Sequence, residues 1–382
     1  MNLNTFRTFV KKEIVFCAGT LAAIISCFFI PPSKEYLGYI NYEVILILFS
    51  LMLVSKALQE SGAFNIWGGK ICRKAGNLRL LSLLLILLCF FSSMLITNDV
   101  ALITFVPFGL ILLSRDTQGK KIIPLVIILQ TIAANLGSML TPFGNPQNLY
   151  LFTKMNLTLP EFSKIILPFG CMSLLMLIGL SFLVKKTPLE NSGNGTTGKG
   201  TGFSSNYKSI TTVFVVVFIV AVCSVLGLIP AYIPAILSLL ATLILCPKNI
   251  TKIDFMLLLT FCSFFIFTGN ISRIDFIRSF LEKMMEKQGF WTSVLTSQII
   301  SNVPAALLLE PFSRDKVQVL LGVNIGGLGT LVASLASLIS YKIYKNYREE
   351  NREISKDNYL LVFTVLNLVF LVPLILMYFI IY

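Results

Sequence analysis

The sequence Asn-Leu-Gly-Ser-Met-Leu-Thr-Pro-Phe-Gly-Asn-Pro-Gln-Asn occupies residues 135–148, within a mostly apolar segment. Pro142 and Pro146 each remove a backbone donor and block a continuous helix, and the two glycines let the chain bend. We therefore predict a helix over residues 121–150 that is broken in its middle. Carbonyl groups freed at such a break can coordinate a cation, and amide groups at the start of a half-helix can face an anion. The alternative is a continuous, proline-kinked helix whose amide side chains bond to neighbouring helices.

The composition of the chain indicates what surrounds this segment. Of 382 residues, 55% are hydrophobic and only 13% are charged, whereas soluble domains carry about 25% charged residues. Apolar runs of about 18 residues, the length that spans a bilayer as a helix, recur along the chain. We predict an all-α integral membrane protein with about nine full transmembrane helices, near residues 14–30, 41–58, 121–150, 165–184, 210–228, 234–246, 254–271, 317–340 and 358–381, plus two re-entrant helical hairpins.

Several functional classes are excluded or disfavoured by composition. The net charge of +13 comes from basic residues in short loops, so we expect no nucleic-acid partner. The chain has no histidine, which excludes a His-ligated metal centre and a Ser-His-Asp triad, and its eight cysteines form no Cys-x-x-Cys pair. We expect the protein not to be an enzyme, to have no cofactor, and to bind no metal beyond a coupling Na⁺.

The segment at residues 80–114 is too long for one crossing and has a polar centre, Thr97-Asn98-Asp99. Basic residues flank it on both sides. If both flanks lie on one side of the membrane, the segment enters, turns at its polar centre and leaves again. Non-helical backbone at that depth must be buried in protein or face a wet cavity. The alternative is two ordinary crossings joined by an external turn at Asn98.

Two motifs recur in the second half in the same order, which indicates an internal repeat. TNDVA at residues 97–101 aligns with SNVPA at 301–305, and NLGS at 135–138 aligns with NIGG at 324–327. The same alignment places Thr141 on Thr330, Asn145 on Ser334 and Val106 on Glu310. It predicts a second hairpin at residues 290–313 and a second broken helix at 317–340. The first repeat then covers residues 1–188, a flexible Gly/Ser/Thr/Asn-rich linker covers 189–206, and the second repeat covers 207–382.

The distribution of positive charge predicts the orientation. With the N-terminus in the cytoplasm and both hairpins re-entrant, 22 of the 31 Lys and Arg residues fall on the inner side and 9 on the outer side. The C-terminus is then outside. The first hairpin opens inward and the second outward, so the repeats have inverted topology, which points to a substrate site near the bilayer midplane. We expect a multi-pass protein of the plasma or inner membrane.

Asp99 is the one acidic residue that we place deep in the membrane. An ionisable group in hydrocarbon costs at least a few kcal/mol, so it marks a functional site by default. A carboxyl there is neutral unless a cation is bound, so Asp99 can exchange a proton for Na⁺ or carry a proton with the substrate. The alternative is that Asp99 caps the second arm of the hairpin by accepting from the Ala101 or Leu102 amide.

The motifs TNDVALITFVPF, ANLGSMLTPFGNPQNLYL, SNVPAALLLEPF and GVNIGGLGTLVASLASLI resemble the ion transporter superfamily. This superfamily includes divalent anion–sodium symporters, citrate permeases, arsenite permeases and a class of sodium–proton antiporters. The resemblance implies a scaffold domain, a homodimer, and a transport domain that moves like an elevator. It also implies a cation between the first hairpin tip and the backbone of residues 137–141, and a substrate carboxylate near Asn98 and Asn302. Two features depart from the symporters: Asp99 replaces a threonine, and the second break lacks proline.

These arguments give two sets of candidate residues. The expected substrate-binding residues are Asn98, Asn145, Pro146, Asn148, Ser301, Asn302, Thr330 and Ser334. The expected cation-binding residues are Thr97, Asn98, Asp99, Asn135, Gly137, Thr141, Asn324 and Gly326.

The leading functional hypothesis is transport of a small inorganic or carboxylate anion across the lipid bilayer, coupled to Na⁺ or H⁺. Sodium–proton antiport through Asp99 is a second hypothesis. A third is efflux of arsenite or antimonite, whose neutral hydroxides need hydroxyl and amide ligands but no basic residue.

Overall fold

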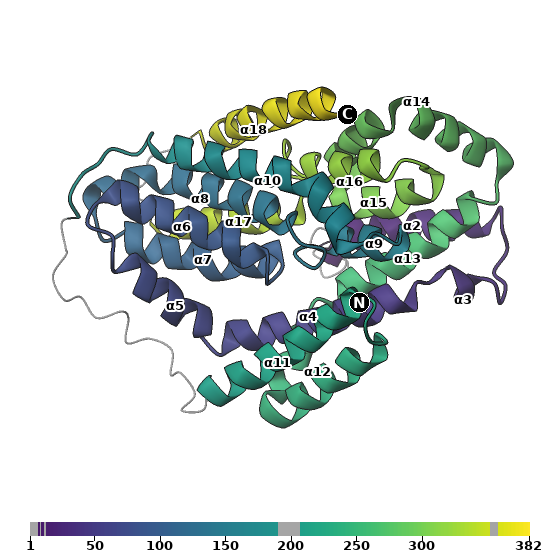
Figure 1. Cartoon of the computed structure of the whole chain (residues 1–382), viewed down its shortest axis with the longest axis horizontal. Coiled ribbons are helices and arrows are strands. Elements are labelled where there is room, and N and C mark those ends of the chain that lie inside the picture. The colour runs from purple at the N-terminus through teal and green to yellow at the C-terminus, as the bar shows by residue number, and fades with distance from the viewer. Residues whose placement is uncertain (1–6, 8, 11–12, 190–206, 352–357) are drawn as a thin grey trace.

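The computed structural model describes residues 13–189, 207–351 and 358–382, together with residues 7, 9 and 10. Within these ranges the chain is helical and has no strand (Figure 1). In order, the helices are α2 (Ile14–Cys27), α3 (Tyr36–Tyr39), α4 (Tyr42–Glu60), α5 (Ala63–Cys72), α6 (Leu78–Ser93), α7 (Asn98–Leu113), α8 (Thr117–Ser138), α9 (Pro146–Lys154), α10 (Leu159–Ser181), α11 (Tyr207–Val225), α12 (Tyr232–Leu245), η1 (Pro247–Lys252), α13 (Phe255–Ile271), α14 (Asp275–Ile300), α15 (Asn302–Leu309), η2 (Glu310–Phe312), α16 (Lys316–Ile325), α17 (Leu335–Glu350) and α18 (Tyr359–Ile381).

The expected all-α membrane architecture is confirmed. Five described helices are long and apolar enough to cross a membrane, namely Tyr42–Glu60, Thr117–Ser138, Leu159–Ser181, Lys208–Val225 and Tyr359–Ile381. Shorter apolar helices and one bent pair make up most of the rest. By helix length and composition, the described residues support five crossings, or six if the bent pair counts as one. The nine full crossings expected from hydropathy therefore stay a prediction.

The first hairpin consists of α6 and α7, joined by a short turn at residues 94–97. Asn77 begins α6 by accepting from the Leu80 amide at 3.0 Å. Asn98, the first residue of α7, is only 5% exposed. This burial fits a tip inside the protein, and the re-entrant path of the segment through the membrane stays a prediction.

The first broken helix is also present. The helix α8 ends at Ser138 and α9 begins at Pro146, which stands at the first helical position, where its missing N–H costs nothing. Asn145 caps α9 by accepting from the Asn148 amide at 2.8 Å. The alternative of a continuous, kinked helix is therefore wrong.

The second hairpin and second break lie where the alignment placed them. The helix α14 is kinked at Gln288, and the apolar arm of the hairpin starts beside Phe290. Ser301, with a φ of 75°, then turns the chain into α15. The second break separates α16 from α17 and contains no proline. Instead, Gly329 has a φ of 114°, a conformation that glycine adopts without strain.

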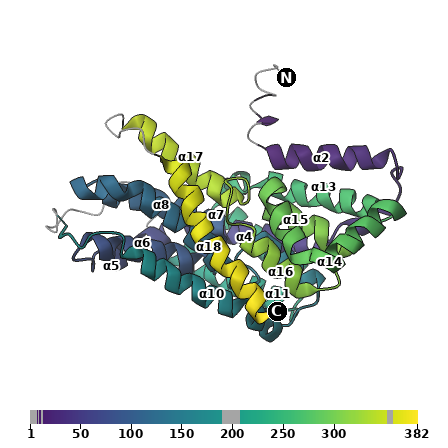
Figure 2. The same cartoon turned by 90° about the horizontal axis from the view of Figure 1, so that it is seen from above.

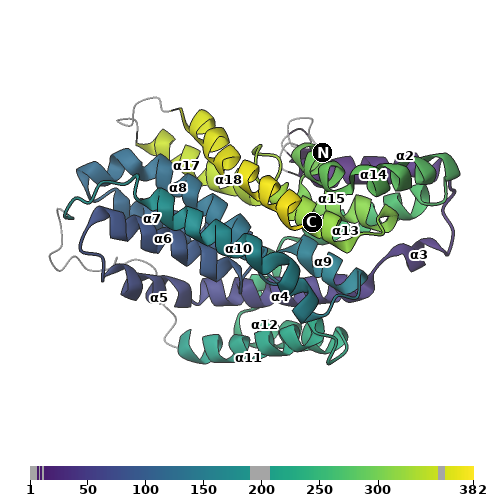
Figure 3. The same ribbon diagram turned by 45° about the horizontal axis from the view of Figure 1, so that its top comes forward.

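The helices pack in two groups that mix the two halves of the sequence. One group contains α4 with α11 and α12, along one edge in Figure 1, and α2 beside α13, as Figure 2 shows. In the other group α17 packs on α7 and α8, and α15 packs on α9. Figure 3 shows the hairpins α6–α7 and α14–α15 in opposite halves of the long axis. The expected linker, residues 189–206, lies outside the described residues except for Leu189.

Candidate functional site

Each hairpin tip docks on the break of its own half of the chain through the same backbone contact. The Asn98 amide donates to the Gly144 carbonyl at 3.3 Å, and the Asn302 amide donates to the Ala333 carbonyl at 3.0 Å. In both cases the residue is the first of its helix arm. The breaks thus hold the tips by main-chain groups, and the tip side chains remain available for other contacts.

Around Asn135 the first tip meets the second break. The Asn135 side-chain oxygen accepts from the Asn98 amide group at 3.1 Å and from the Ser334 hydroxyl at 3.0 Å. The Asn135 amide group donates to the Ser337 hydroxyl at 3.4 Å. All four side chains are buried, so these polar groups satisfy one another in the interior.

A second cluster forms around Asn324. Its amide group donates to the Asn148 side-chain oxygen at 2.6 Å, and its own oxygen accepts from the Asn145 amide group at 3.3 Å. Asn148 also donates to the Met139 and Thr141 carbonyls, at 2.9 and 3.2 Å. The second broken helix is thereby bonded directly to the start of α9, and Asn148 connects it to the Met139 carbonyl at the end of α8.

The two clusters repeat one contact in reverse. Asn145 aligns with Ser334, and Asn135 aligns with Asn324. Asn145 and Ser334 each stand just before the second half-helix of their own repeat. Each donates to the aligned asparagine of the other repeat, Asn145 to Asn324 and Ser334 to Asn135. We call the six side chains of these contacts the central amide network: Asn98, Asn135, Asn145, Asn148, Asn324 and Ser334.

Two glycines, Gly137 and Gly326, allow the broken helices to pack closely against the hairpin arms. A Cβ on Gly137 would collide with the Phe90 carbonyl oxygen and lie 2.6 Å from the Ser93 hydroxyl. A Cβ on Gly326 would lie 2.9 Å from both Val294 Cα and Ser297 Cβ. Both glycines were predicted to bind a cation through their backbone, and in both cases close helix packing is an additional reason for a glycine.

The remaining residues of the predicted cation site lie at the first tip and break. Thr97 precedes α7, and the Thr141 hydroxyl donates to the Met94 carbonyl at 2.6 Å, which closes the break onto the hairpin turn. Asp99 is half-buried in the first turn of α7. The Ala101 amide donates to the Thr97 carbonyl, and the Asp99 carboxyl accepts no hydrogen bond within the described part of the chain, so the alternative that Asp99 is a helix cap is wrong.

Of the predicted substrate-binding residues, the structure gathers all but one near the network. Ser301 is buried behind Asn302, and Pro146 is buried beside Asn145. Thr330 is exposed and bonds to Gln298, donating to its carbonyl at 3.2 Å. Thr330 therefore fixes the loop of the second break and does not join the central amide network.

Comparison with known proteins identifies the family to which this chain belongs. A sequence profile described as citrate transporter matches residues 5–315. The chain belongs to the citrate transporter family. An uncharacterized transporter of Methanocaldococcus jannaschii is 32% identical over 301 residues, 78% of this chain and 80% of the relative. The inner membrane protein YbiR of Escherichia coli is 29% identical over 351 residues, 88% of each chain. A silicon efflux transporter of Oryza sativa is 29% identical over 153 residues, 40% of this chain and 31% of the relative.

The protein is therefore a membrane transporter, and the relatives named here are transporters and a membrane protein. Within this citrate transporter family member, the two broken helices meet at the central amide network.

A residue of α14 that holds the second break was not predicted from the sequence. Gln298 donates to the Gly326 and Leu328 carbonyls, both at 2.7 Å, and accepts from the Thr330 amide at 2.9 Å. These bonds satisfy backbone groups that the break removes from the helix. Gln298 aligns with Met94, so the repeat gave no signal for it. Ser337, which bonds Asn135, was missed because it resembles any small residue of an apolar helix.

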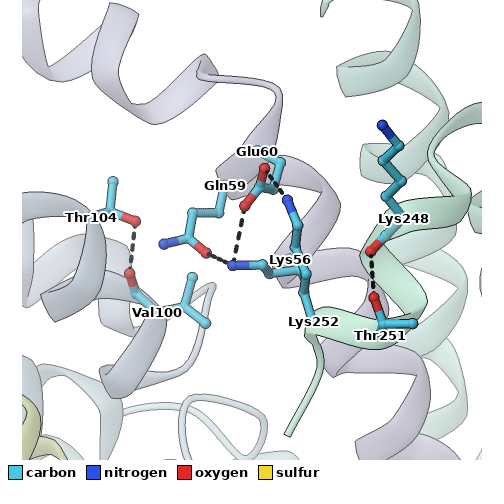
Figure 4. Close-up of polar contacts among 8 residues, drawn as sticks. All are labelled: Lys56, Gln59, Glu60, Val100, Thr104, Lys248, Thr251 and Lys252. Carbon is cyan, nitrogen blue, oxygen red and sulfur yellow. Dashed lines mark hydrogen bonds and ion pairs between the residues drawn. The ribbon is translucent and has the colours of Figure 1, made fainter. Parts of the chain in front are cut away.

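A second polar feature of this transporter lies where α4 ends at Glu60. Glu60 pairs with Lys56 at 3.2 Å and with Lys252 of η1 at 2.8 Å. Figure 4 shows Gln59 of the same turn extending toward Val100 and Thr104 of α7. We call Lys56, Glu60 and Lys252 the Glu60 cluster. The cluster has a net positive charge.

Proposed function

We propose that this protein is a secondary active transporter that moves a small anion, a carboxylate or an oxyanion, with Na⁺ or H⁺ as the coupling ion. The observation that carries the proposal is the reversed pair of contacts, Asn145 to Asn324 and Ser334 to Asn135. This pair brings both breaks and the first hairpin tip to one buried place, where half-helix ends can bind ions of either sign.

The chemistry of the network limits the charge of the ligand. Its side chains are amides and hydroxyls, and no hydrogen bond of the described residues joins it to a lysine or arginine. A multiply charged anion in such a place needs its charge compensated from elsewhere. A bound cation at the first tip, between residues 97–99 and 137–141, would supply that compensation. Asp99 would bind this cation or a proton in its place.

A neutral hydroxide is the second candidate substrate. Silicic acid and arsenious acid present only hydroxyl groups, which amide and serine oxygens and N–H groups match without any basic residue. The relative named as a silicon efflux transporter supports this candidate. Transport would then run outward, with the proton or sodium gradient driving efflux.

We further propose an elevator mechanism in a homodimer. The helices α2, α4 and α11–α13 would form the fixed scaffold, and the two hairpins with both broken helices would move. The extensive packing of α4 with α11 and α12, and of α2 with α13, supports this division. The name of the E. coli relative and the lysine and arginine distribution support an inner or plasma membrane location with a cytoplasmic N-terminus and an external C-terminus.

Counterflow in proteoliposomes tests the proposal. Vesicles loaded with unlabelled citrate, arsenite or silicic acid are diluted into a trace of the same labelled compound. A carrier takes up label transiently above equilibrium, with saturation by the trapped compound. If none of these compounds supports counterflow but an imposed Na⁺ gradient moves protons, the anion proposal fails and sodium–proton antiport replaces it.

A further inference from the structure

A small cavity lies at the end of α4 opposite to Glu60. It has a volume of about 230 Å³ and is lined from the α3–α4 junction, from α9, from α13 and from the end of α15. The helix α4 has 19 residues, so this cavity is about 28 Å along the helix from the Glu60 cluster. We call it the Asn41 cavity after the residue that caps α4. It lies between the helices proposed as scaffold and those proposed to move.

A carboxyl group lies directly behind the lining of this cavity. Glu310 begins η2, directly after α15, and the cavity is lined by its neighbour Pro311 and by Tyr150. The Tyr150 hydroxyl donates to the Glu310 Oε2 atom at 2.9 Å. Glu310 forms no ion pair within 4 Å in the described part of the chain. Its side-chain hydrogen-bond partner in the described part of the chain is thus one neutral hydroxyl.

The other ionisable groups around the cavity are few. Lys154, one helical turn after Tyr150 on α9, also lines the cavity and is the positive group that acts on Glu310. From the opposite wall Tyr39 faces the cavity and accepts from Arg273, which also pairs with Glu35. Thr268 and Ser272 of α13 line it without a titratable group.

A purely structural role does not require an acid at this position. In the first hairpin the equivalent residue is Val106, at the same distance in sequence from its tip asparagine and also followed by Pro-Phe. Both arms form helix up to this point. Hence the hairpin tolerates an aliphatic side chain here, and the carboxyl of Glu310 is left with a role that Val106 does not share.

The position of Glu310 connects the cavity to the central amide network. Tyr150 follows Asn148 by two residues on α9, and Asn148 bonds Asn324. The arm that ends at Glu310 begins at Asn302. A charged carboxyl beside the cavity favours water there, because burying the charge costs several kcal/mol, whereas a protonated carboxyl can be covered when the two helix groups slide together.

From this geometry we propose that Glu310 binds a coupling proton at the Asn41 cavity and releases it there when the cavity is hydrated. The proton passes between cavity water and a carboxyl oxygen of Glu310, and no covalent bond to the substrate is involved. This inference rests on the proposed transport function and specifies H⁺ as a coupling ion at a carboxyl other than Asp99.

The test compares Glu310→Gln with Asp315→Asn. Glutamine keeps an acceptor for the Tyr150 hydroxyl but cannot bind the proton. Asp315 is an exposed acid five residues away that caps α16, and asparagine is an equally good cap, so it is a matched control. Two readouts are needed: the pH dependence of citrate, arsenite or silicic acid flux in proteoliposomes, and the infrared carboxylic-acid band of the purified protein during pH titration.

The expected results are specific to Glu310. Flux by wild type and Asp315→Asn falls about tenfold per pH unit above its midpoint, as expected when one proton must bind. Glu310→Gln loses this dependence, and one titrating carboxylic-acid band disappears from its infrared spectrum. A Glu310→Gln protein with the wild-type pH profile and the full set of bands would overturn the inference.

Two further outcomes separate this inference from its premise. If wild type transports none of the probes, the proposed function fails, and the infrared titration still decides whether Glu310 binds a proton in the accessible pH range. If Glu310→Gln does not fold, Tyr150→Phe replaces it: the carboxylate loses its hydroxyl donor, so the midpoint moves to higher pH. An unchanged midpoint in Tyr150→Phe would contradict the inference.

Discussion

The amide group of Asn145 donates to the side-chain oxygen of Asn324 across 3.3 Å and so bonds the first broken helix to the second. Asn145 also caps α9, with its own oxygen accepting from the Asn148 amide. One side chain therefore starts a half-helix and ties it to the opposite half of the chain. Because Ser334 makes the corresponding contact to Asn135, neither break can shift without disturbing the other.

Replacing Asn145 separates capping from the bond between the breaks. Asn145→Ser keeps a good cap but is too short to reach Asn324, which leaves a buried oxygen without its donor at a cost of about 1–3 kcal/mol. Asn145→Ala loses the cap as well, for about 1 kcal/mol more. Thermal unfolding in detergent should rank wild type above serine above alanine. Equal melting temperatures for wild type and Asn145→Ser would contradict the bond's contribution.

A methyl group on Gly137 should disrupt the contact between α8 and the first hairpin. The new Cβ would overlap the Phe90 carbonyl oxygen, which belongs to helix backbone and cannot move away. We expect Gly137→Ala to lose about 1–3 kcal/mol of stability, as overpacking does in well-packed interiors. Gly179→Ala is the control, because nothing lies within 4 Å of its Cβ position, and alanine there should stabilise α10 slightly. Similar unfolding temperatures for the two variants would refute the close contact.

Gln298 should hold the second break in place of the prolines of the first. Gln298→Glu keeps the acceptor for the Thr330 amide but loses both donor bonds to the Gly326 and Leu328 carbonyls. At about 0.5–1.5 kcal/mol for each bond, we expect a loss of about 1–3 kcal/mol, measured by thermal unfolding. Gln59→Glu, at a partly exposed side chain, should change stability little. A Gln298→Glu variant as stable as wild type would show that the loop of the second break does not depend on Gln298.

The Glu60 cluster should increase the rate at which an anion reaches the hairpin. Neutralising Lys252 or Lys56 as Lys→Gln lowers the positive charge at this end of α4, so kcat/KM for an anionic substrate should fall severalfold at low ionic strength. The difference should vanish near 1 M salt, where the screening length is about 3 Å. Lys34→Gln, near α3, is the control for an exposed lysine at the other end of α4. A rate loss that persists at high salt would indicate a structural role.

Much of this architecture follows from the sequence because it depends on local chemistry. Pro142, Pro146 and the neighbouring glycines determine the first break, and the polar tip between apolar arms determines the first hairpin. The repeat then located Asn302 and the second break, although that break has no proline. Six of the predicted site residues are those of the central amide network.

Other features depend on contacts between distant segments and left no local signal. Gln298 resembles any surface glutamine until the second break is seen to lie against it. Thr330 aligns with Thr141 but is exposed and bonds Gln298, so the alignment did not show that it lies outside the central amide network. The short helix α5 was not predicted, since its ten residues include two glycines and form no apolar run. The packing of α17 on α7 joins opposite halves, which no local pattern encodes.

Gradient-driven uptake by Asp99→Asn proteoliposomes tests the central claim most directly. Wild-type vesicles are given an imposed Na⁺ or H⁺ gradient and labelled citrate, arsenite or silicic acid, and accumulation above equilibrium is measured. The account predicts that wild type concentrates at least one compound with one of the gradients. It also predicts that Asp99→Asn exchanges that compound without concentrating it. Accumulation by Asp99→Asn equal to that of wild type would contradict the role of Asp99, and no gradient-driven accumulation by wild type would contradict coupled transport.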